Sequence, residues 1–186
     1  MTVQKLFIAF ILVDLMMSLK TQRLPIITES VDITKFYAIN ERIWTVKTTK
    51  PTTMTCKLDI VYARTRNGIR FERKYYWFGS RINLYLEGTF MSKPIFKTTY
   101  NAMKVTKKDS IYKSIDHLLY SYRNYACGIF KVTVLHPEQT KFYELRVKDS
   151  AFVQPKPSCI ERFENMSKGA KITTVYSSAC KATRTL

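Results

Sequence analysis

Apolar and polar side chains alternate most clearly between residues 54 and 78. Apolar residues at every second position from Met54 to Tyr62 predict a strand with two distinct faces. The run ends at Thr65-Arg66-Asn67-Gly68, whose Asn-Gly pair favours a tight hairpin turn. A return strand follows over residues 69–78. One face of this strand collects Ile69, Phe71, Arg73, Tyr75 and Trp77.

Comparable runs occur before and after this hairpin at regular spacing. They are rich in β-branched and aromatic residues, and segments with Gly, Pro, Asn or Ser separate them. After Asn101 the pattern weakens, and the charged residues from Lys104 to Asp109 predict an exposed loop. Such a series is typical of an all-β sandwich or an up-and-down barrel. The eight predicted strands are residues 43–49, 54–63, 69–78, 82–91, 95–100, 116–122, 125–135 and 140–147.

Two segments have helical rather than strand periodicity. Lys35–Arg42 predicts a short helix with Ser30 or Asp32 near its N-cap, placed to plug one end of the sheet structure. Pro155 and Pro157 end the strands, and residues 159–165 predict a short helix lying against the sheet. The tail from Thr173 to Cys180 would be tied down by its last cysteine.

The first eighteen residues resemble a secretory signal. A short basic segment precedes the apolar run Leu6–Val13, which is too short to span a bilayer, and Met16–Ser18 offers a cleavage zone. No other window approaches a transmembrane span. We therefore expect residues 1–18 to be a signal peptide and residues 19–186 to be one secreted, extracellular domain.

The charge balance adds a second prediction, about partners. The 186-residue chain has 31 Lys and Arg against 14 Asp and Glu, a formal net charge of +17. This charge predicts attraction to anionic partners such as sulfated glycans, membrane surfaces, nucleic acid or acidic proteins. The basic residues are scattered, which argues against nucleic acid, and on exposed strand faces they would also discourage edge pairing. We expect a monomer.

The four cysteines fit an oxidising compartment, and three pairings of Cys56, Cys127, Cys159 and Cys180 are open. None lies in a CxxC motif, and the only histidines are His117 and His136, so we expect no metal site. Neither a glycine-rich phosphate loop nor a nucleophile elbow is present. We therefore expect no enzyme activity and no cofactor. Asn165-Met166-Ser167 is a glycosylation sequon.

The order of these features resembles the tick salivary lipocalins, the histamine-binding protein family. The features are the Trp44 strand, Cys56 early in the second strand, Leu118–Ser121 before Cys127, Glu144-Leu145, a proline-rich loop, Cys159 and Cys180. The general lipocalin Gly-x-Trp motif is replaced by Arg42-Ile43-Trp44. The resemblance implies an eight-stranded antiparallel up-and-down lipocalin barrel around a ligand cavity, with a short N-terminal helix and a C-terminal helix packed outside. It also implies the disulfides Cys56–Cys180 and Cys127–Cys159.

Ligand chemistry is where the chain departs from the family. Amine-binding members carry a Cys-Asp pair and a Glu-Leu followed by an aromatic residue, whereas this chain has Cys127-Gly128 and Glu144-Leu145-Arg146. Strand geometry puts Phe142, Glu144 and Arg146 on one face. Three interpretations stay open: Glu144 binds a protonated amine, it pairs with Arg146 inside the barrel, or the two form a surface pair.

A second ligand class uses the positive charge. Aromatic residues including Phe130, with Arg73 or Arg146 among them, would suit an amphipathic anion such as a leukotriene. The expected function is sequestration of a small host mediator, histamine or another biogenic amine, against inflammatory, immune or haemostatic defences. A basic surface protein that binds sulfated glycans or a host protein is a further alternative. The candidate ligand-binding residues are Glu144, Trp44, Phe71, Arg73, Tyr75, Trp77, Phe142 and Arg146.

Overall fold

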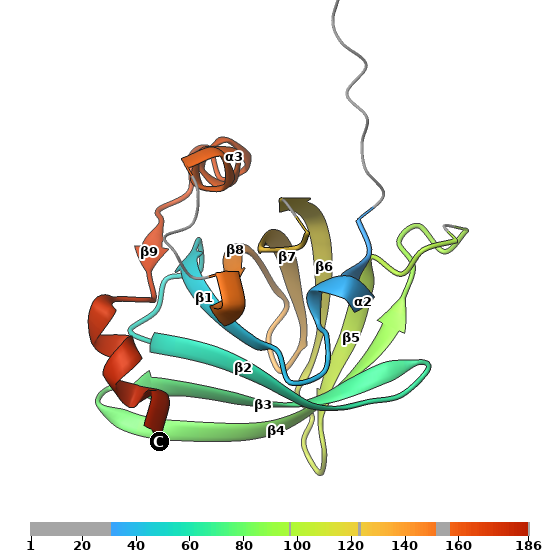
Figure 1. The fold of residues 1–186 in the computed structure, drawn as a ribbon, viewed down its shortest axis with the longest axis horizontal. Coiled ribbons are helices and arrows are strands. Elements are labelled where there is room, and N and C mark those ends of the chain that lie inside the picture. The colour runs from blue at the N-terminus through green and yellow to red at the C-terminus, as the bar shows by residue number, and fades with distance from the viewer. Residues whose placement is uncertain (1–30, 97, 123, 152–156, 186) are drawn as a thin grey trace, which may run out of the picture. The chain divides into compact units, whose positions relative to one another are not determined.

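Eight antiparallel strands close into a barrel in the computed structural model, which describes residues 31–96, 98–122, 124–151 and 157–185 (Figure 1). Each strand pairs with its neighbour in the chain, and β1 pairs with both β8 and β2, so the sheet closes on itself. The predicted signal peptide lies outside the described residues. The strands are β1 (Arg42–Thr48), β2 (Thr55–Arg64), β3 (Gly68–Trp77), β4 (Ser80–Met91), β5 (Ala102–Lys107), β6 (Lys113–Tyr122), β7 (Cys127–His136) and β8 (Thr140–Lys148).

The sequence misplaced one strand. None of the described residues between 95 and 100 lies in a strand, and Ile95 and Phe96 are 90% and 86% exposed in the β4–β5 connection. The strand is instead β5, in the segment that was predicted to be a loop. Its lysines misled the prediction because Lys104 faces solvent while Met103 and Val105 are fully buried. The other predicted strands are confirmed, with shifted ends.

A short helix closes one end of the barrel. The predicted helix over Lys35–Arg42 is wrong in its bounds, since α2 spans only Ile33–Phe36. Asp32 caps it by accepting a hydrogen bond from the backbone N–H of Thr34 at 2.9 Å. Ile33, Phe36 and Tyr37 are fully buried in the main core. Figure 1 shows α2 at this end of the barrel.

Helix α3 (Pro157–Met166) packs on the outside of β7 and β8. Its Phe163 is fully buried in a cluster with Ile129 and Leu145, separate from the barrel core. The disulfide Cys127–Cys159 joins β7 to this helix. Among the described residues, no helix has the length and hydropathy needed to cross a bilayer.

The C-terminal segment completes the wall where β1 and β2 separate. These strands pair only over Arg42–Trp44 and Leu58–Ile60. Beyond that point β9 (Thr173–Thr174) pairs with β1, and the backbone N–H of Cys56 donates to the carbonyl of Val175 at 2.8 Å. The disulfide Cys56–Cys180 fixes this segment, so both predicted disulfides are confirmed. Two 3-10 helices, η2 (Asp149–Ala151) and η3 (Ser178–Thr185), follow β8 and β9.

Candidate functional site

A cavity of about 330 Å³ lies inside the barrel, toward the end opposite α2. At that end the connections β1–β2, β3–β4, β5–β6 and β7–β8 meet, because consecutive antiparallel strands turn alternately at the two ends. Lining residues from these connections include Lys50, Thr52, Pro137 and Glu138. The cavity is therefore placed to exchange a small molecule with solvent.

Its walls are mostly apolar and aromatic. Of the candidates from sequence, Arg73, Tyr75, Trp77, Phe142 and Glu144 line the cavity. The ring centroids of Tyr75 and Trp77 are 6.4 Å apart, and Trp77 is 43% exposed, so an aromatic surface runs from the wall to the mouth. The other apolar wall residues include Leu84, Leu86, Val132 and Val134.

Three candidates lie elsewhere. Phe71 is fully buried in the core behind the wall, with Arg73 over its ring at 5.4 Å. Trp44 points to the outside of the barrel, where it packs on Tyr176 and its Nε1 donates to Asp149 at 2.9 Å. Arg146 lies behind Glu144 and is not part of the cavity lining. Neither Phe71 nor Trp44 is placed to contact a ligand in this cavity.

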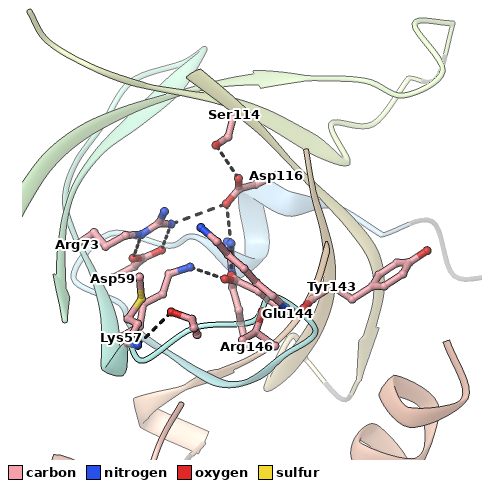
Figure 2. A network of polar contacts seen from close by, with 12 residues as sticks. Lys57, Asp59, Arg73, Ser114, Asp116, Tyr143, Glu144 and Arg146 are labelled. Atoms are coloured by element: carbon pink, nitrogen blue, oxygen red, sulfur yellow. Dashed lines mark hydrogen bonds and ion pairs between the residues drawn. The ribbon is translucent and has the colours of Figure 1, made fainter. Parts of the chain in front are cut away.

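Charged side chains gather between the cavity and the helix plug, and we call them the ion cluster (Figure 2). Successive side chains along a strand point to opposite faces, and these residues occupy inward positions, so they are buried. Outward residues such as Tyr143 point away from the cluster (Figure 2). The cluster has three cations and three anions, so its formal charge is zero. Its members are Lys57 and Asp59 on β2, Arg73 on β3, Asp116 on β6, and Glu144 and Arg146 on β8.

Glu144 is held by two cations. Lys57 Nζ lies 2.6 Å from its Oε1, and Arg146 Nη2 lies 2.6 Å from its Oε2, to which Arg146 Nε also donates at 2.8 Å. Burial opposes ionisation, but Lys57 and Arg146 outweigh it and hold the pKa of Glu144 well below its ordinary value. Glu144 is therefore an ionised carboxylate whose two oxygens are both engaged.

The other two carboxylates are also paired. Arg73 donates through Nε and Nη2 to the two oxygens of Asp59, at 2.7 and 2.8 Å. Arg146 Nη2 lies 2.7 Å from Asp116, which also accepts from Ser114. Tyr37 contacts Asp59 and accepts from Arg146, so the helix plug rests on the cluster. Removing one partner of such a buried pair costs about 3–5 kcal/mol, because an uncompensated charge remains.

Lys57 is the cluster member with the most adjustable charge. Burial and the positive charge of Arg73 lower its pKa to about 8, against the opposing effect of Glu144. At neutral pH Lys57 is mostly protonated, yet its proton is held less tightly than that of an exposed lysine. A ligand charge nearby would shift this equilibrium.

Of the three interpretations of Glu144, the geometry agrees with the ion pair inside the barrel. Glu144 pairs with Arg146, and Lys57 is an additional partner. Sequence reasoning missed Lys57, Asp59 and Asp116. On β2 the more apolar face, with Cys56 and Leu58, points outward and is covered by Trp44 and Cys180. The signal was Cys56, since a cysteine bonded to a tail outside the barrel puts its neighbour Lys57 inside.

At Gly128 on β7, where amine-binding members of the family carry an aspartate, the structure leaves no room for a side chain. A Cβ atom there would lie 2.8 Å from Phe36 Cε2 and 2.8 Å from Leu118 Cδ1. The aromatic side chain of α2 occupies the space that a side chain at this position would need. The cluster's acidic groups come from other strands instead. Asn165, in the predicted sequon, is exposed on α3.

A closed eight-stranded barrel with an interior cavity and a C-terminal helix outside defines the lipocalin class of ligand-binding proteins. Residues 80–182 match the family model described as tick histamine binding protein, and the chain belongs to that family. No curated protein sequence matches it significantly.

Solved structures share the fold. A serotonin complex of the protein AM182 has 21% identity and a TM-score of 0.53, over 76% of this chain and 85% of that chain. The siderocalin Ex-FABP has 6% identity and a TM-score of 0.54, over 75% and 91% of the two chains. A bovine odorant-binding protein triple mutant has 11% identity and a TM-score of 0.52, over 76% and 93%.

Proposed function

We propose that this protein is a secreted lipocalin that sequesters a small amphipathic ligand with an acidic head group. The observation that carries the proposal is an excess of hydrogen-bond donors over acceptors where the ion cluster meets the cavity. Because a ligand head group must satisfy what the pocket leaves unpaired, this imbalance favours an anion.

The imbalance comes from Lys57 and Arg73. A lysine ammonium has three N–H donors, and within the described residues Lys57 contacts one carboxylate oxygen. The contacts of Arg73 with Asp59 use Nε and Nη2, and the described part of the chain has no hydrogen bond from Nη1. Glu144, by contrast, already accepts from both cations. An entering carboxylate would meet free donors, whereas an entering ammonium would meet an occupied acceptor.

The walls suit the rest of such a ligand. Phe142, Leu86 and Val132 give the cavity wall an apolar surface. Tyr75 and Trp77 extend this surface to the mouth. Burying an aliphatic chain there contributes about 25 cal/mol per Å² of apolar area. A fatty-acid-derived mediator combines this body with a carboxylate head.

A biogenic amine is the second candidate, and one observation favours it. Glu144 lines the cavity, and the Lys57 ammonium beside its Oε1 has a lowered pKa of about 8. A ligand ammonium could take the place of Lys57 at that oxygen. The family's description and the serotonin complex of AM182 support this class.

Removal of a host mediator by binding, without chemical change, is the physiological role we propose. The mediator would be an inflammatory, immune or haemostatic signal at a feeding site, and the protein would act outside the cell as a monomer. Both disulfides fit this location.

Calorimetry of the secreted protein against a leukotriene, histamine and serotonin tests the proposal. We expect the acidic lipid to bind and Lys57→Met to weaken it at least about tenfold, the effect of one lost charged hydrogen bond. The matched control is Lys108→Met, an exposed lysine in the β5–β6 connection, which should bind as wild type does. Tight amine binding without lipid binding would reject the acidic head group, and no heat with any ligand would reject sequestration of these mediators.

A further inference from the structure

Most of the positive charge of this chain lies away from the ligand cavity. The ion cluster has three cations and three anions, so the formal excess of +17 lies entirely outside it. Part of this excess gathers on the outer face of β6, β7 and β8. We propose that a groove on this face binds a sulfated polysaccharide chain, at a site separate from the cavity.

The groove is a hollow of about 670 Å³ between these strands and the β4–β5 connection. Lys93, Lys131 and Lys141 line it together with His117, and its described lining contains no Asp or Glu. Two acidic residues adjoin the lining in sequence: Asp116 belongs to the buried ion cluster, and Glu138 lines the interior cavity. No ion pair to these three lysines is present among the residues that the structure describes. Their charge is therefore available to a partner.

Strand register brings the basic groups together. Lys131 on β7 lies directly opposite His117 on β6, and Lys141 on β8 lies opposite Thr133, two residues along β7 from Lys131. Diagonal neighbours of this kind are about 7–8 Å apart. The side chains point outward, because the alternate residues Val132 and Phe142 line the interior cavity. Helix α3 covers the neighbouring part of this face, around Ile129 and Leu145, and leaves the basic part uncovered.

One end of the groove is fixed by Asn101. Its amide oxygen accepts from the backbone N–H of Lys93 at 2.7 Å, and its Nδ2 donates to the Lys93 carbonyl at 2.6 Å. Nδ2 also lies 3.2 Å from His117 Nε2, which must act as the acceptor. Asn101 is 2% exposed, so this contact orders the loop before any partner arrives. A prearranged groove loses less conformational entropy on binding than mobile lysines would.

The chemistry of the lining selects a sulfated polysaccharide among polyanions. The hydroxyl group of Thr133 and the amide group of Gln139 lie beside the lysines and can bond sugar hydroxyls. The described residues of the lining include no Phe, Tyr or Trp, so they offer no aromatic platform for unpaired bases. From Lys131 to Leu135 the strand rises roughly 13 Å, which fits a linear chain better than a single ion. An extracellular protein would meet such chains on cell surfaces and in matrix.

Retention on immobilised heparin, followed by titration with a heparin oligosaccharide, tests this site. The groove variant is Lys131→Ser with Lys141→Ser. The matched control is Lys168→Ser with Lys171→Ser, which removes equal charge from two exposed lysines between α3 and β9. We expect the groove variant to bind about tenfold more weakly and the control to stay within about twofold of wild type. Lys131→Arg with Lys141→Arg should retain binding, and thermal unfolding shows whether each variant is folded.

Equal loss in the groove and control variants would overturn the proposal, because binding would then follow total charge. Undiminished binding to desulfated heparin would also overturn the proposal. The same holds if a DNA duplex competes as well as heparin at equal charge. Failure of leukotriene or amine binding leaves this test untouched, since the groove and the cavity lie on opposite faces of the sheet.

Discussion

Lys57 is the cluster residue whose protonation separates the two ligand classes. Its pKa of about 8 means that raising the pH through this value removes a positive charge from the cavity floor and frees an oxygen of Glu144. Affinity for an acidic ligand should therefore fall as pH rises, with the midpoint above 8, because a bound carboxylate stabilises the ammonium. Affinity for an amine should rise over the same interval. Titrations well below and well above pH 8 measure the sign.

The Lys57→Met variant is the control for this pH dependence, which it should abolish. The ligand-free protein provides a second measurement. Between about 8 and the ordinary lysine value of 10.5, the unfolded chain holds the Lys57 proton more tightly than the folded chain does. Unfolding free energy should therefore rise with pH across this interval, relative to Lys57→Met. A flat difference between the two proteins would contradict the lowered pKa.

Gly128→Asp tests whether the family's aspartate could simply be restored. We expect no gain in histamine binding and a loss of stability of at least about 1–3 kcal/mol, because the new side chain collides with Phe36 and Leu118. Urea denaturation and histamine titration give the two measurements. Gly128→Ala is the matched control, since it adds crowding without charge. A stable aspartate variant with new histamine affinity would contradict this expectation, because it would mean that Phe36 and α2 can shift at little cost in stability.

Individual site residues were harder to predict than the barrel. The positions of Arg73, Tyr75 and Trp77 in the cavity wall could be predicted because the inward face of β3 is also its more aromatic face. The same rule failed on β2, where Lys57 and Asp59 face inward and are stabilised by ions on other strands, Lys57 by Glu144 and Asp59 by Arg73. Periodicity within one strand contains no information about these partners. The family resemblance supplied Glu144 and alternation along β8 supplied Arg146, but neither supplied Lys57.

At the scale of elements, seven of the eight barrel strands could be predicted from the alternation of apolar and polar residues. Strand β5 could not. Ile95 and Phe96 are apolar but exposed, and Lys104 lies within a strand. Hydrophobicity predicts a strand only where one face is buried, and burial depends on where the meander places each segment. Helix α2 is short for a related reason, since its buried residues end at Tyr37.

The two disulfides fix different elements and should have different effects on binding. Cys56–Cys180 closes 124 positions and Cys127–Cys159 closes 32, so chain entropy gives about 5 and about 4 kcal/mol as upper guides. The first also fixes the C-terminal segment, whose Val175 lines the cavity. Cys56→Ser with Cys180→Ser should therefore weaken ligand retention as well as stability.

The matched variant is Cys127→Ser with Cys159→Ser, which frees only α3 on the outside. We expect it to lose stability and keep wild-type ligand affinity wherever it remains folded. Chemical denaturation and stopped-flow ligand release separate the two quantities. Equal release rates in the two variants would mean that the C-terminal segment does not help to close the cavity.

At the scale of the whole molecule, the charges are divided between a neutral interior and a strongly basic exterior. Repulsion among exposed cations destabilises the folded chain and is screened by salt, whereas the buried ion cluster is screened much less. Raising NaCl from low to physiological concentration should therefore raise the unfolding free energy by on the order of 1 kcal/mol, or roughly 2–4 °C in Tm. Differential scanning calorimetry measures the shift.

Exposed ion pairs act in the opposite direction, and Arg70–Glu87 is an example, with both side chains more than half exposed. Such pairs contribute about 0–1 kcal/mol each and weaken with salt. Glu87→Gln therefore serves as the control, and it should show a slightly larger salt stabilisation than wild type because one attractive pair is gone. A fall in Tm with added NaCl would mean that attraction within surface ion pairs outweighs repulsion, despite the net charge of +17.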